Sequence, residues 1–428
     1  MTDDRRLTVF AVLVIVQLSC GDLVRNIIGW PAWGATVGAL LVWALVELWL
    51  RRKRVKRPGI AVLMFLALAF LSAFWAASWW STLLGAAISL GIAASALVMT
   101  CMPLQRFITL LHWCLQAQLI GSLLFEVAAA LRGGGVRPVW YGDIANSEVY
   151  WWTHGELFAG GRIYGLPGNP NLIAMLAMLA LIIAVARALS GRDRRTWPVW
   201  VGLSVLMIAL SQSITVALIG GAILAASTLI VIRFRVSRPA YYRAFFASLS
   251  LMGIAVIIGA VLWQALAAWL GRSSDLTGRL DIWRIVLVRW LDSPIVGDGW
   301  MGYWMPWVEP YDGLIVHGSI VHLQAHNAWI DMALQLGIIG VLIFFALQVT
   351  AMRNAVAIIR YGNEHPAIRA VPLLLLIALA VQGLTESRPL TEIGALLLFV
   401  FAAGLPRSRE GGPRTLPIET QPRQEQPK

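Results

Sequence analysis

Long apolar runs with few charges constrain the fold of this chain more than any other feature of its sequence. One helix needs about 20 apolar residues to cross the hydrocarbon core of a bilayer, and the 428-residue sequence contains many such runs. Only 13% of its residues are charged, about half the ~25% of soluble domains. The chain is therefore predicted to be an all-α polytopic membrane protein, not a soluble globular one.

Applied along the chain, the length rule predicts about 12 transmembrane helices. Their bounds are 7–23, 27–49, 59–79, 82–102, 105–130, 166–187, 197–211, 213–233, 244–270, 326–349, 370–385 and 389–405. The run from 197 to 233 is too long for one helix, and the polar residues Ser211, Gln212 and Ser213 divide it.

The lysines and arginines are distributed unevenly between the connections. If the N-terminus is cytoplasmic, the connections on its side hold most of the 34 Lys and Arg, including the basic run at 51–57. Connections rich in Lys and Arg stay in the cytoplasm, so both termini are predicted to be cytoplasmic. The net charge of +12 is then a topology signal, and no nucleic-acid partner is expected.

Two long connections, 131–165 and 271–325, fall on the opposite side of the membrane. Both are rich in Trp, Tyr and Gly, residues that favour interfacial loops and irregular backbone. We predict one transmembrane domain, 1–406, with a large helical subdomain between its ninth and tenth helices. The Pro- and Gln-rich tail, 407–428, is predicted to be a disordered cytoplasmic segment.

The second of these connections contains a predicted amphipathic helix, Gly278–Leu291. Its large apolar residues recur at helical spacing on one face, and they are Leu280, Trp283, Leu287 and Trp290. Such a helix is expected to lie along the membrane surface. In that position it presents Arg279 and Arg284 to the space above the bilayer.

Several arginines remain on the predicted outer side although topology disfavours them there. They are Arg162, Arg279, Arg284 and Arg388. A guanidinium binds phosphate through two parallel hydrogen bonds and stays charged at any working pH. A cluster of them suits a pyrophosphate head group on a lipid carrier. Two alternatives stay open: contacts with lipid phosphates, and salt bridges to Asp275, Asp281 and Asp298.

A histidine pair stands where the second outer connection meets the next apolar run. On a helix, the i, i+4 spacing of His322 and His326 would place both rings on one face. Asp331 is the nearby carboxylate, and the spacing does not make a metal set, so no metal is expected. An imidazole is suited to taking a proton from a sugar hydroxyl, and Asn327 can help to orient the ring. The alternative is a histidine bonded to backbone at a helix start.

The segment from Gly161 to Asn171 opens the sixth predicted helix. Its glycines and prolines prevent helix until after Pro170, and Asn171 is expected to cap the helix. A helix N-terminus is itself an anion site, which would place Arg162 and backbone donors at the depth of the histidines. A plain helix cap is the alternative.

These motifs, taken in order, resemble a known family. They are Gly-Arg-x-x-Gly-x-x-x-Asn-Pro-Asn at 161–171, Thr277-Gly278-Arg279 with Trp283, Ser-Pro-Ile-Val-Gly-Asp-Gly at 293–299, and His326-Asn327 followed by Leu-Gly-Ile-Ile-Gly at 336–340. With the predicted helices, they resemble the O-antigen ligase/polymerase superfamily from about residue 59 to 405, in a layout similar to the ligases. One position departs: many members carry an Arg after a Ser at the start of the eighth helix, where this chain has Ser213 and Ile214.

The resemblance implies a metal-independent, inverting glycosyltransferase of the GT-C type, without a cofactor, in the bacterial inner membrane. Its expected partners are undecaprenyl-pyrophosphate-linked glycan, a lipid A–core acceptor and membrane lipids, and the O-antigen-like glycan is transferred on the periplasmic face. By motif match, Arg279 and Arg162 hold the pyrophosphate and His326 is the base. The residues expected to contact substrate are His322, Arg284, Tyr164, Asn169, Asn327 and Arg388.

Two other functions remain open. A polymerase of the same superfamily would use a second carrier-linked glycan as acceptor. A transporter of lipid-linked sugar would carry charged residues near the middle of its helices or paired broken helices in two halves. The predicted spans are nearly free of charge at their centres, and no halves repeat. These features argue against the transporter. Between ligase and polymerase, the sequence favours the ligase.

Overall fold

The structure is a computed structural model, and it describes most of the chain. The described residues are 3–139, 148–233, 236–240, 242–248, 250, 253, 275–317 and 320–405. Most of the predicted helix at 244–270 lies outside them, and the predicted tail at 407–428 lies entirely outside them.

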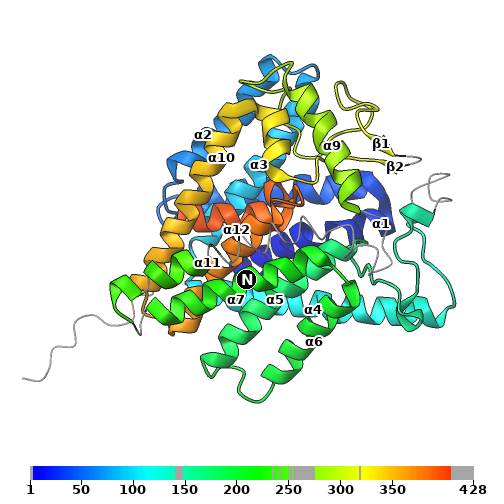
Figure 1. Cartoon of the computed structure of the whole chain (residues 1–428). Helices are drawn as coiled ribbons and strands as arrows, with labels where there is room; N and C mark the ends of the chain where they lie inside the picture. Colours follow the sequence, from blue (N-terminus) through cyan, green and yellow to red (C-terminus); the bar gives the residue numbers. More distant parts are fainter. Residues whose placement is uncertain are drawn as a thin grey trace, which may run out of the picture.

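Helices dominate the described residues (Figure 1). They are α1 (Asp3–Leu50), α2 (Ile60–Leu71), α3 (Trp79–Met99), α4 (Leu104–Leu131), α5 (Pro170–Leu189), α6 (Trp197–Ser211), α7 (Ile214–Arg233), α9 (Asp275–Trp290), α10 (Ala328–Tyr361), α11 (Pro366–Gln382) and α12 (Glu392–Ala403). The short 3-10 helices are η1 (Ser72–Phe74), η3 (Glu148–Tyr150), η4 (Leu157–Ala159) and η5 (Arg388–Leu390). One small antiparallel hairpin, β1 (Val316–His317) and β2 (Ile320–Val321), completes the described elements.

The prediction of an all-α polytopic membrane protein is confirmed. Six of the described helices are long and apolar enough to span a bilayer, namely α1, α3, α4, α5, α7 and α10. The helix α2 with its η1 extension, α6, α11 and α12 are shorter apolar helices packed into the same bundle. The number of spans, about 12 by the length rule, stays a prediction.

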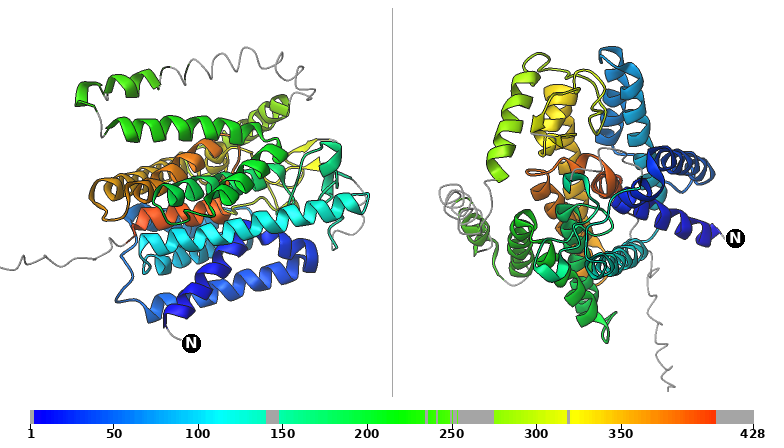
Figure 2. Two further views of the ribbon diagram at one scale, coloured as in Figure 1. Left: turned by 90° about the horizontal axis from the view of Figure 1, so that it is seen from below. Right: turned by 90° about the vertical axis from the view of Figure 1, so that its right-hand side faces the viewer.

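The helix α1 is a hairpin of two antiparallel halves. Its backbone leaves helical geometry at Cys20 (φ −144°) and at Gly29 (φ 86°). These two breaks turn the chain back on itself. The two halves contact each other, and Phe10 packs edge-on against Trp43 with ring centroids 5.5 Å apart. Both views of Figure 2 show the two blue halves side by side. They correspond to the first two predicted spans.

The helix α10 is broken at Gly337 by a loop that follows α9. The backbone there has φ 62°, and a Cβ atom on Gly337 would lie 2.2 Å from the carbonyl carbon of Ile295. Past the break, the N–H of Ile338 donates to the carbonyl of Pro294 at 2.9 Å. Only glycine allows this backbone conformation and this close approach. The loop carries the motif at 293–299, so its pairing with the motif at 336–340 is a direct contact.

The segment around α9 has a hydrophobic cluster of its own. The helix contributes Ile282 and Val286 to it, while Leu280 is 56% exposed and Leu287 is 41% exposed. Of the predicted apolar face, Trp283 packs against this cluster, while the chain after residue 300 covers the side of Ile282 and Val286. That cluster also contains Met301, Trp304, Val308, Tyr311, Ile315, Ala325 and Leu334.

The two predicted outer connections meet at one end of the bundle. Figure 1 shows β1 and β2 at the same end as the segment between α4 and α5, and the left view of Figure 2 agrees. The residues 140–147, 271–274 and 318–319 of these connections lie outside the described part. The parts of both loops that the structure describes border the same region, and the candidate site lies there.

Candidate active site

The centre of the candidate site is a carboxylate, Glu386, in the short connection between α11 and η5. Its side chain is almost wholly buried, and the residue is 5% exposed. Oε1 accepts hydrogen bonds from Arg279 Nη2 at 3.0 Å and from Asn171 Nδ2 at 3.1 Å. Oε2 lies 3.0 Å from Nδ1 of His326. Three separate elements thus direct donors at one buried anion.

The second arginine, Arg162, joins this group through Asn171. Arg162 Nη2 donates to Asn171 Oδ1 at 3.3 Å, and its Nε donates to the carbonyl of Ser211 at 3.0 Å. Ser213 Oγ also donates to Asn171 Oδ1, at 2.9 Å. The amide of Asn171 therefore links Arg162 on one side to Glu386 on the other. We call Arg162, Asn171, Arg279, His326 and Glu386 the Glu386 network.

The backbone around His326 is held in an uncommon conformation. His326 has φ 51°, in the left-handed region that residues other than Gly rarely adopt. On one side, Trp283 Nε1 donates to the carbonyl of Ala325 at 3.0 Å. On the other, Asn327 Oδ1 caps α10 by accepting from Trp329 N at 2.9 Å. Strain of this kind persists only where surrounding contacts fix it, and it is concentrated at functional sites.

Glu386 determines which ring nitrogen of His326 carries the proton in the neutral ring. Burial raises the pKa of Glu386, but His326 and Arg279 more than offset it and lower the pKa to about 2. Because Glu386 is then ionised, the His326 nitrogen facing it, Nδ1, carries a proton. The other nitrogen, Nε2, is free to accept one in the neutral ring. It lies 3.4 Å from Nδ1 of His322.

The predicted helical arrangement of the two histidines is wrong, although their rings do meet. Asn327 is the N-cap of α10, so His322 and His326 both precede the helix. Their ring centroids are 5.6 Å apart because the irregular backbone brings them together. The two rings are neighbours, as the i, i+4 spacing predicted, but a helix does not bring them together.

The helix cap after the Gly161 motif is also shifted from the prediction. Asn169, not Asn171, caps α5, and its Oδ1 accepts from Asn171 N at 2.9 Å and Leu172 N at 3.1 Å. Pro170 explains the shift, because proline favours the first helical position and leaves the preceding residue as the cap. This frees the side chain of Asn171 for the network, and it gives Asn169 a structural contact where substrate contact was predicted.

Tyr164 lies in a loop anchored by a buried acid that the sequence did not single out. Glu126 Oε1 accepts from the backbone N–H groups of Tyr164 at 2.8 Å and Gly165 at 2.6 Å. Its Oε2 accepts from Thr153 Oγ1 at 2.7 Å. The Tyr164 ring lies against His154, with ring centroids 4.9 Å apart. Glu126 thus fixes the backbone two residues from Arg162.

Of the other predicted arginines, one pairs with a different carboxylate and one is exposed. Arg388 forms an ion pair with Glu392, and Tyr303 donates to the same carboxylate at 2.7 Å. Arg284 is exposed on α9 and makes none of the network contacts described above. The structure therefore brings together three of the predicted residues that carry charge or protons: Arg162, Arg279 and His326.

Glu386 itself was missed by sequence reasoning. The alternative considered for the outer arginines was pairing with aspartates, and Arg289 does pair with Asp298 at 3.1 Å. Arg279 instead pairs with Glu386, 107 residues later in the chain. A signal was present, because Glu386 directly follows a predicted apolar run and precedes Arg388 by two residues.

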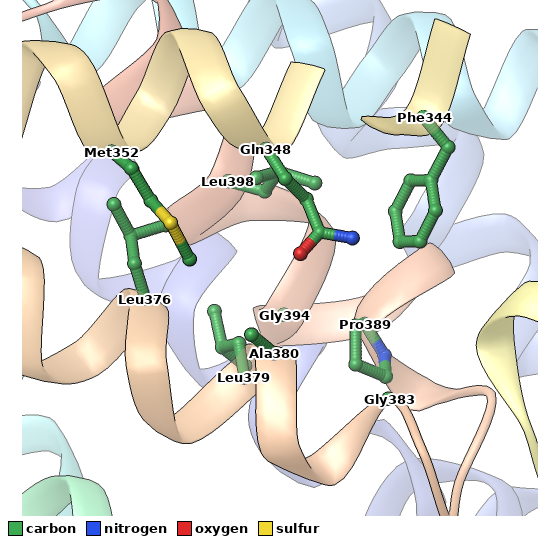
Figure 3. Close-up of a pocket in the computed structure, with 10 residues that line it drawn as sticks. All are labelled: Phe344, Gln348, Met352, Leu376, Leu379, Ala380, Gly383, Pro389, Gly394 and Leu398. Carbon is green, nitrogen blue, oxygen red and sulfur yellow. The ribbon is translucent and has the colours of Figure 1, made fainter. Parts of the chain in front are cut away.

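A small cavity lies between α10, α11 and α12 (Figure 3). Gln348 supplies the only polar side chain among the 10 residues drawn there. The cavity measures about 10 Å³, enough for roughly one water molecule. We regard it as a packing gap inside the bundle rather than as a substrate site. Its lining is Phe344, Gln348, Met352, Leu376, Leu379, Ala380, Gly383, Pro389, Gly394 and Leu398.

Comparison with known proteins agrees with this architecture. Residues 197–345, which include Arg279 and His326, match a family model described as O-Antigen ligase. The exopolysaccharide production protein ExoQ of Rhizobium meliloti (strain 1021) is 26% identical over 277 residues, which cover 60% of this chain and 62% of that protein. The match thus spans less than two thirds of that relative's length. Together with the motifs and the membrane helices, these matches support a relationship of this chain to the O-antigen ligase superfamily.

Proposed function

We propose that the protein transfers a glycan from undecaprenyl pyrophosphate to an acceptor hydroxyl, at the periplasmic face of the bacterial inner membrane. The observation that carries this proposal is the convergence of Arg279 and His326 on Glu386, with Arg162 joined through Asn171. Such a site combines groups that bind phosphate with a group that accepts a proton.

The arginines suit the leaving group. When the bond between the sugar's anomeric carbon and the phosphate oxygen breaks, its electron pair stays on that oxygen. Arg279 and Arg162 stabilise the developing charge, and fixed cations in a water-poor site are effective at this. No His, Cys, Asp or Glu groups of three or more gather as a metal site among the residues that the structure describes. The arginines are therefore the proposed partners of the pyrophosphate.

His326 suits the acceptor. The acceptor oxygen forms the new bond to the anomeric carbon, and its proton passes to Nε2 of His326. Glu386, bonded to Nδ1 at 3.0 Å, holds the ring and stabilises the imidazolium, as a carboxylate does in a Ser-His-Asp triad. His322 lies close enough to take the proton onward. A single displacement of this kind inverts the anomeric centre.

The proposed acceptor is lipid A–core, as in an O-antigen ligase. A second candidate is a growing glycan on another carrier, which would make the protein a polymerase. One observation favours it: the similar protein of Rhizobium meliloti is described as an exopolysaccharide production protein. Both candidates share the donor and the site, and they differ in the acceptor.

The test is transfer in vitro by the purified protein. Undecaprenyl-pyrophosphate-linked glycan is offered with lipid A–core in one reaction and with a second carrier-linked glycan in another. Glycosylated lipid A–core supports the ligase, and a ladder of longer carrier-linked chains supports the polymerase. Failure to transfer to either acceptor, by protein that is folded, would overturn both.

A further inference from the structure

The contacts of Glu386 are those that a bound phosphate would make. A carboxylate and a phosphate both present paired oxygens to a guanidinium, and Glu386 takes its hydrogen bond from Arg279 at 3.0 Å. Asn171 and His326 supply two further donors to the same carboxylate. These donors come from α5, α9 and the segment before α10, and the acid comes from a fourth segment. The protein has thus placed an anion of its own among its anion-binding groups.

The charges of the network set Glu386 in competition with a bound phosphate for Arg279. Arg162 and Arg279 carry two positive charges, and Glu386 carries one negative charge, because its pKa is lowered to about 2. The nearby Arg388 is already paired with Glu392. A carrier pyrophosphate brings a negative charge on each phosphate. If Glu386 kept Arg279, two like charges would meet at one partly buried guanidinium, which is unfavourable.

We propose that Glu386 is an internal stand-in for the carrier's phosphate, which exchanges partners when that phosphate binds. The phosphate takes Arg279, while Glu386 releases Arg279 and keeps His326. This inference rests on the proposed function, since it requires the network to bind a pyrophosphate. It adds a role for Glu386 beyond orienting the histidine.

The exchange couples phosphate binding to the positioning of the base. While Glu386 is shared, part of its charge is neutralised by Arg279. Once Arg279 has turned to the phosphate, His326 is the remaining charged partner of Glu386 in the network. Glu386 then holds the Nδ1–H of His326 without competition from Arg279, so the ring is positioned for proton transfer when the donor substrate is in place.

The test is Glu386→Gln, which keeps the size of the side chain and removes its charge. Undecaprenyl pyrophosphate is titrated into the purified protein, and turnover is measured with carrier-linked glycan. We expect binding to tighten about tenfold, because the internal competitor for Arg279 is gone. We expect kcat to fall about 10²–10⁴-fold, the usual contribution of a positioned base. A purely structural role would instead weaken both.

Two further variants make the result decisive. Asp281→Asn removes the same charge from an exposed position on α9, and it should leave the affinity for undecaprenyl pyrophosphate unchanged. Glu386→Asp serves if the Gln variant is unstable, because the shorter acid loosens the contact with Arg279 and should also tighten phosphate binding. Weaker or unchanged binding in both Glu386 variants would overturn the exchange.

The exchange can fail separately from the function on which it rests. If Arg279→Ala binds undecaprenyl pyrophosphate as well as the wild type, the network does not hold pyrophosphate and the proposed function fails. If Arg279→Ala weakens binding but neither Glu386 variant tightens it, the proposed function stands and only the stand-in role is lost.

Discussion

Two clusters of arginine and carboxylate in the described chain are each built around a buried glutamate, Glu386 in one and Glu47 in the other. One is the Glu386 network. The other, which we call the α1 clasp, comprises Asp3, Arg6, Glu47 and Arg51 where the two halves of α1 end. In the clasp, Arg51 Nε donates to Glu47 Oε2 at 2.9 Å and Arg51 Nη2 to Asp3 Oδ1 at 2.6 Å. Arg6 Nε lies 2.7 Å from Glu47 Oε1.

The difference between them lies in where the partners come from. Every member of the clasp lies in α1 or directly follows it, so its ion pairs close one helical hairpin, and the clasp contains no histidine. The Glu386 network draws its members from four segments, and it includes an imidazole and a strained backbone at His326. Local charge pairing serves to lock a hairpin. Charges brought together from distant segments around a titratable ring indicate chemistry.

The largest expected effect comes from removing an arginine of the Glu386 network. Arg279→Ala and Arg162→Ala should each abolish transfer in vitro while the protein remains folded in membranes, because the leaving pyrophosphate loses a fixed cation. Arg→Lys at either position should also be damaging, since a point charge does not replace the planar fork. Arg132→Ala, at an exposed position on the same side, is the matched control. Near-normal transfer by either alanine variant would remove the pyrophosphate role.

The next effect concerns His326, the proposed base. His326→Ala should lower kcat about 10²–10⁴-fold and leave binding of carrier lipid nearly unchanged. His322→Ala should cost less, because His322 meets His326 at Nε2, the nitrogen that does not face Glu386, at 3.4 Å. Turnover and carrier binding are measured for both variants. A His326→Ala protein that binds carrier poorly but turns over normally at saturation would make His326 a phosphate ligand, with the base elsewhere.

The pH profile separates His326 from Glu386. The pKa of Glu386 falls from 4.5 to about 2 on folding. Its contribution to stability is therefore fully present above the unfolded pKa and is lost only as pH falls toward about 2. Between pH 5 and 8 Glu386 stays ionised, so an acidic loss of activity in that window reports an imidazole. The profile of wild type should show this acidic limb, and that of His326→Ala should lack it. A limb that persists in the variant would assign the titration to another group.

A smaller effect on transfer, but a large one on stability, is expected in the clasp. Glu47 is 1% exposed, and Glu47→Ala leaves Arg51 and Arg6 without a buried partner. Breaking a buried pair in this way costs about 3–5 kcal/mol, measurable as a lower midpoint of unfolding in detergent. Arg54, whose side chain is 72% exposed, is the control, with an expected cost of about 0–1 kcal/mol for Arg54→Ala. Transfer per folded molecule should stay normal in both. If Glu47→Ala lost transfer without losing stability, the clasp would not be a purely structural cluster.

The sequence was a good guide to the fold because hydropathy and length act locally. An apolar run of about 20 residues is a membrane helix wherever it stands in the chain. Turn residues likewise predicted that α5 starts at the prolines and glycines after Gly161. Its cap was misplaced by two residues, because the first-position preference of Pro170 decided it.

The candidate site was predictable only in part, because its members meet through tertiary contacts. The motifs gave Arg162, Arg279 and His326 as separate residues. Nothing local in the sequence says that Glu386 receives donors from Asn171, 215 residues earlier, and from Arg279, 107 residues earlier. The buried face of α9 was missed for the same reason, since the fold of the following segment decides which side is covered.

The smallest expected effect is that of a chelator. In the clasp and in the Glu386 network alike, the carboxylates are satisfied by arginine, imidazole or amide donors, and no three His, Cys, Asp or Glu side chains gather elsewhere in the described part of the chain. Because Arg162 and Arg279 supply the positive charge that a divalent ion would otherwise bring, transfer should be unchanged within about twofold in EDTA. The assay uses purified protein, with and without EDTA, followed by added Mg²⁺, Mn²⁺ or Ca²⁺, and a metal-dependent glycosyltransferase run in parallel confirms that chelation was complete. Activity that is lost in EDTA and restored by one of these ions would mean that the arginines do not act alone on the pyrophosphate.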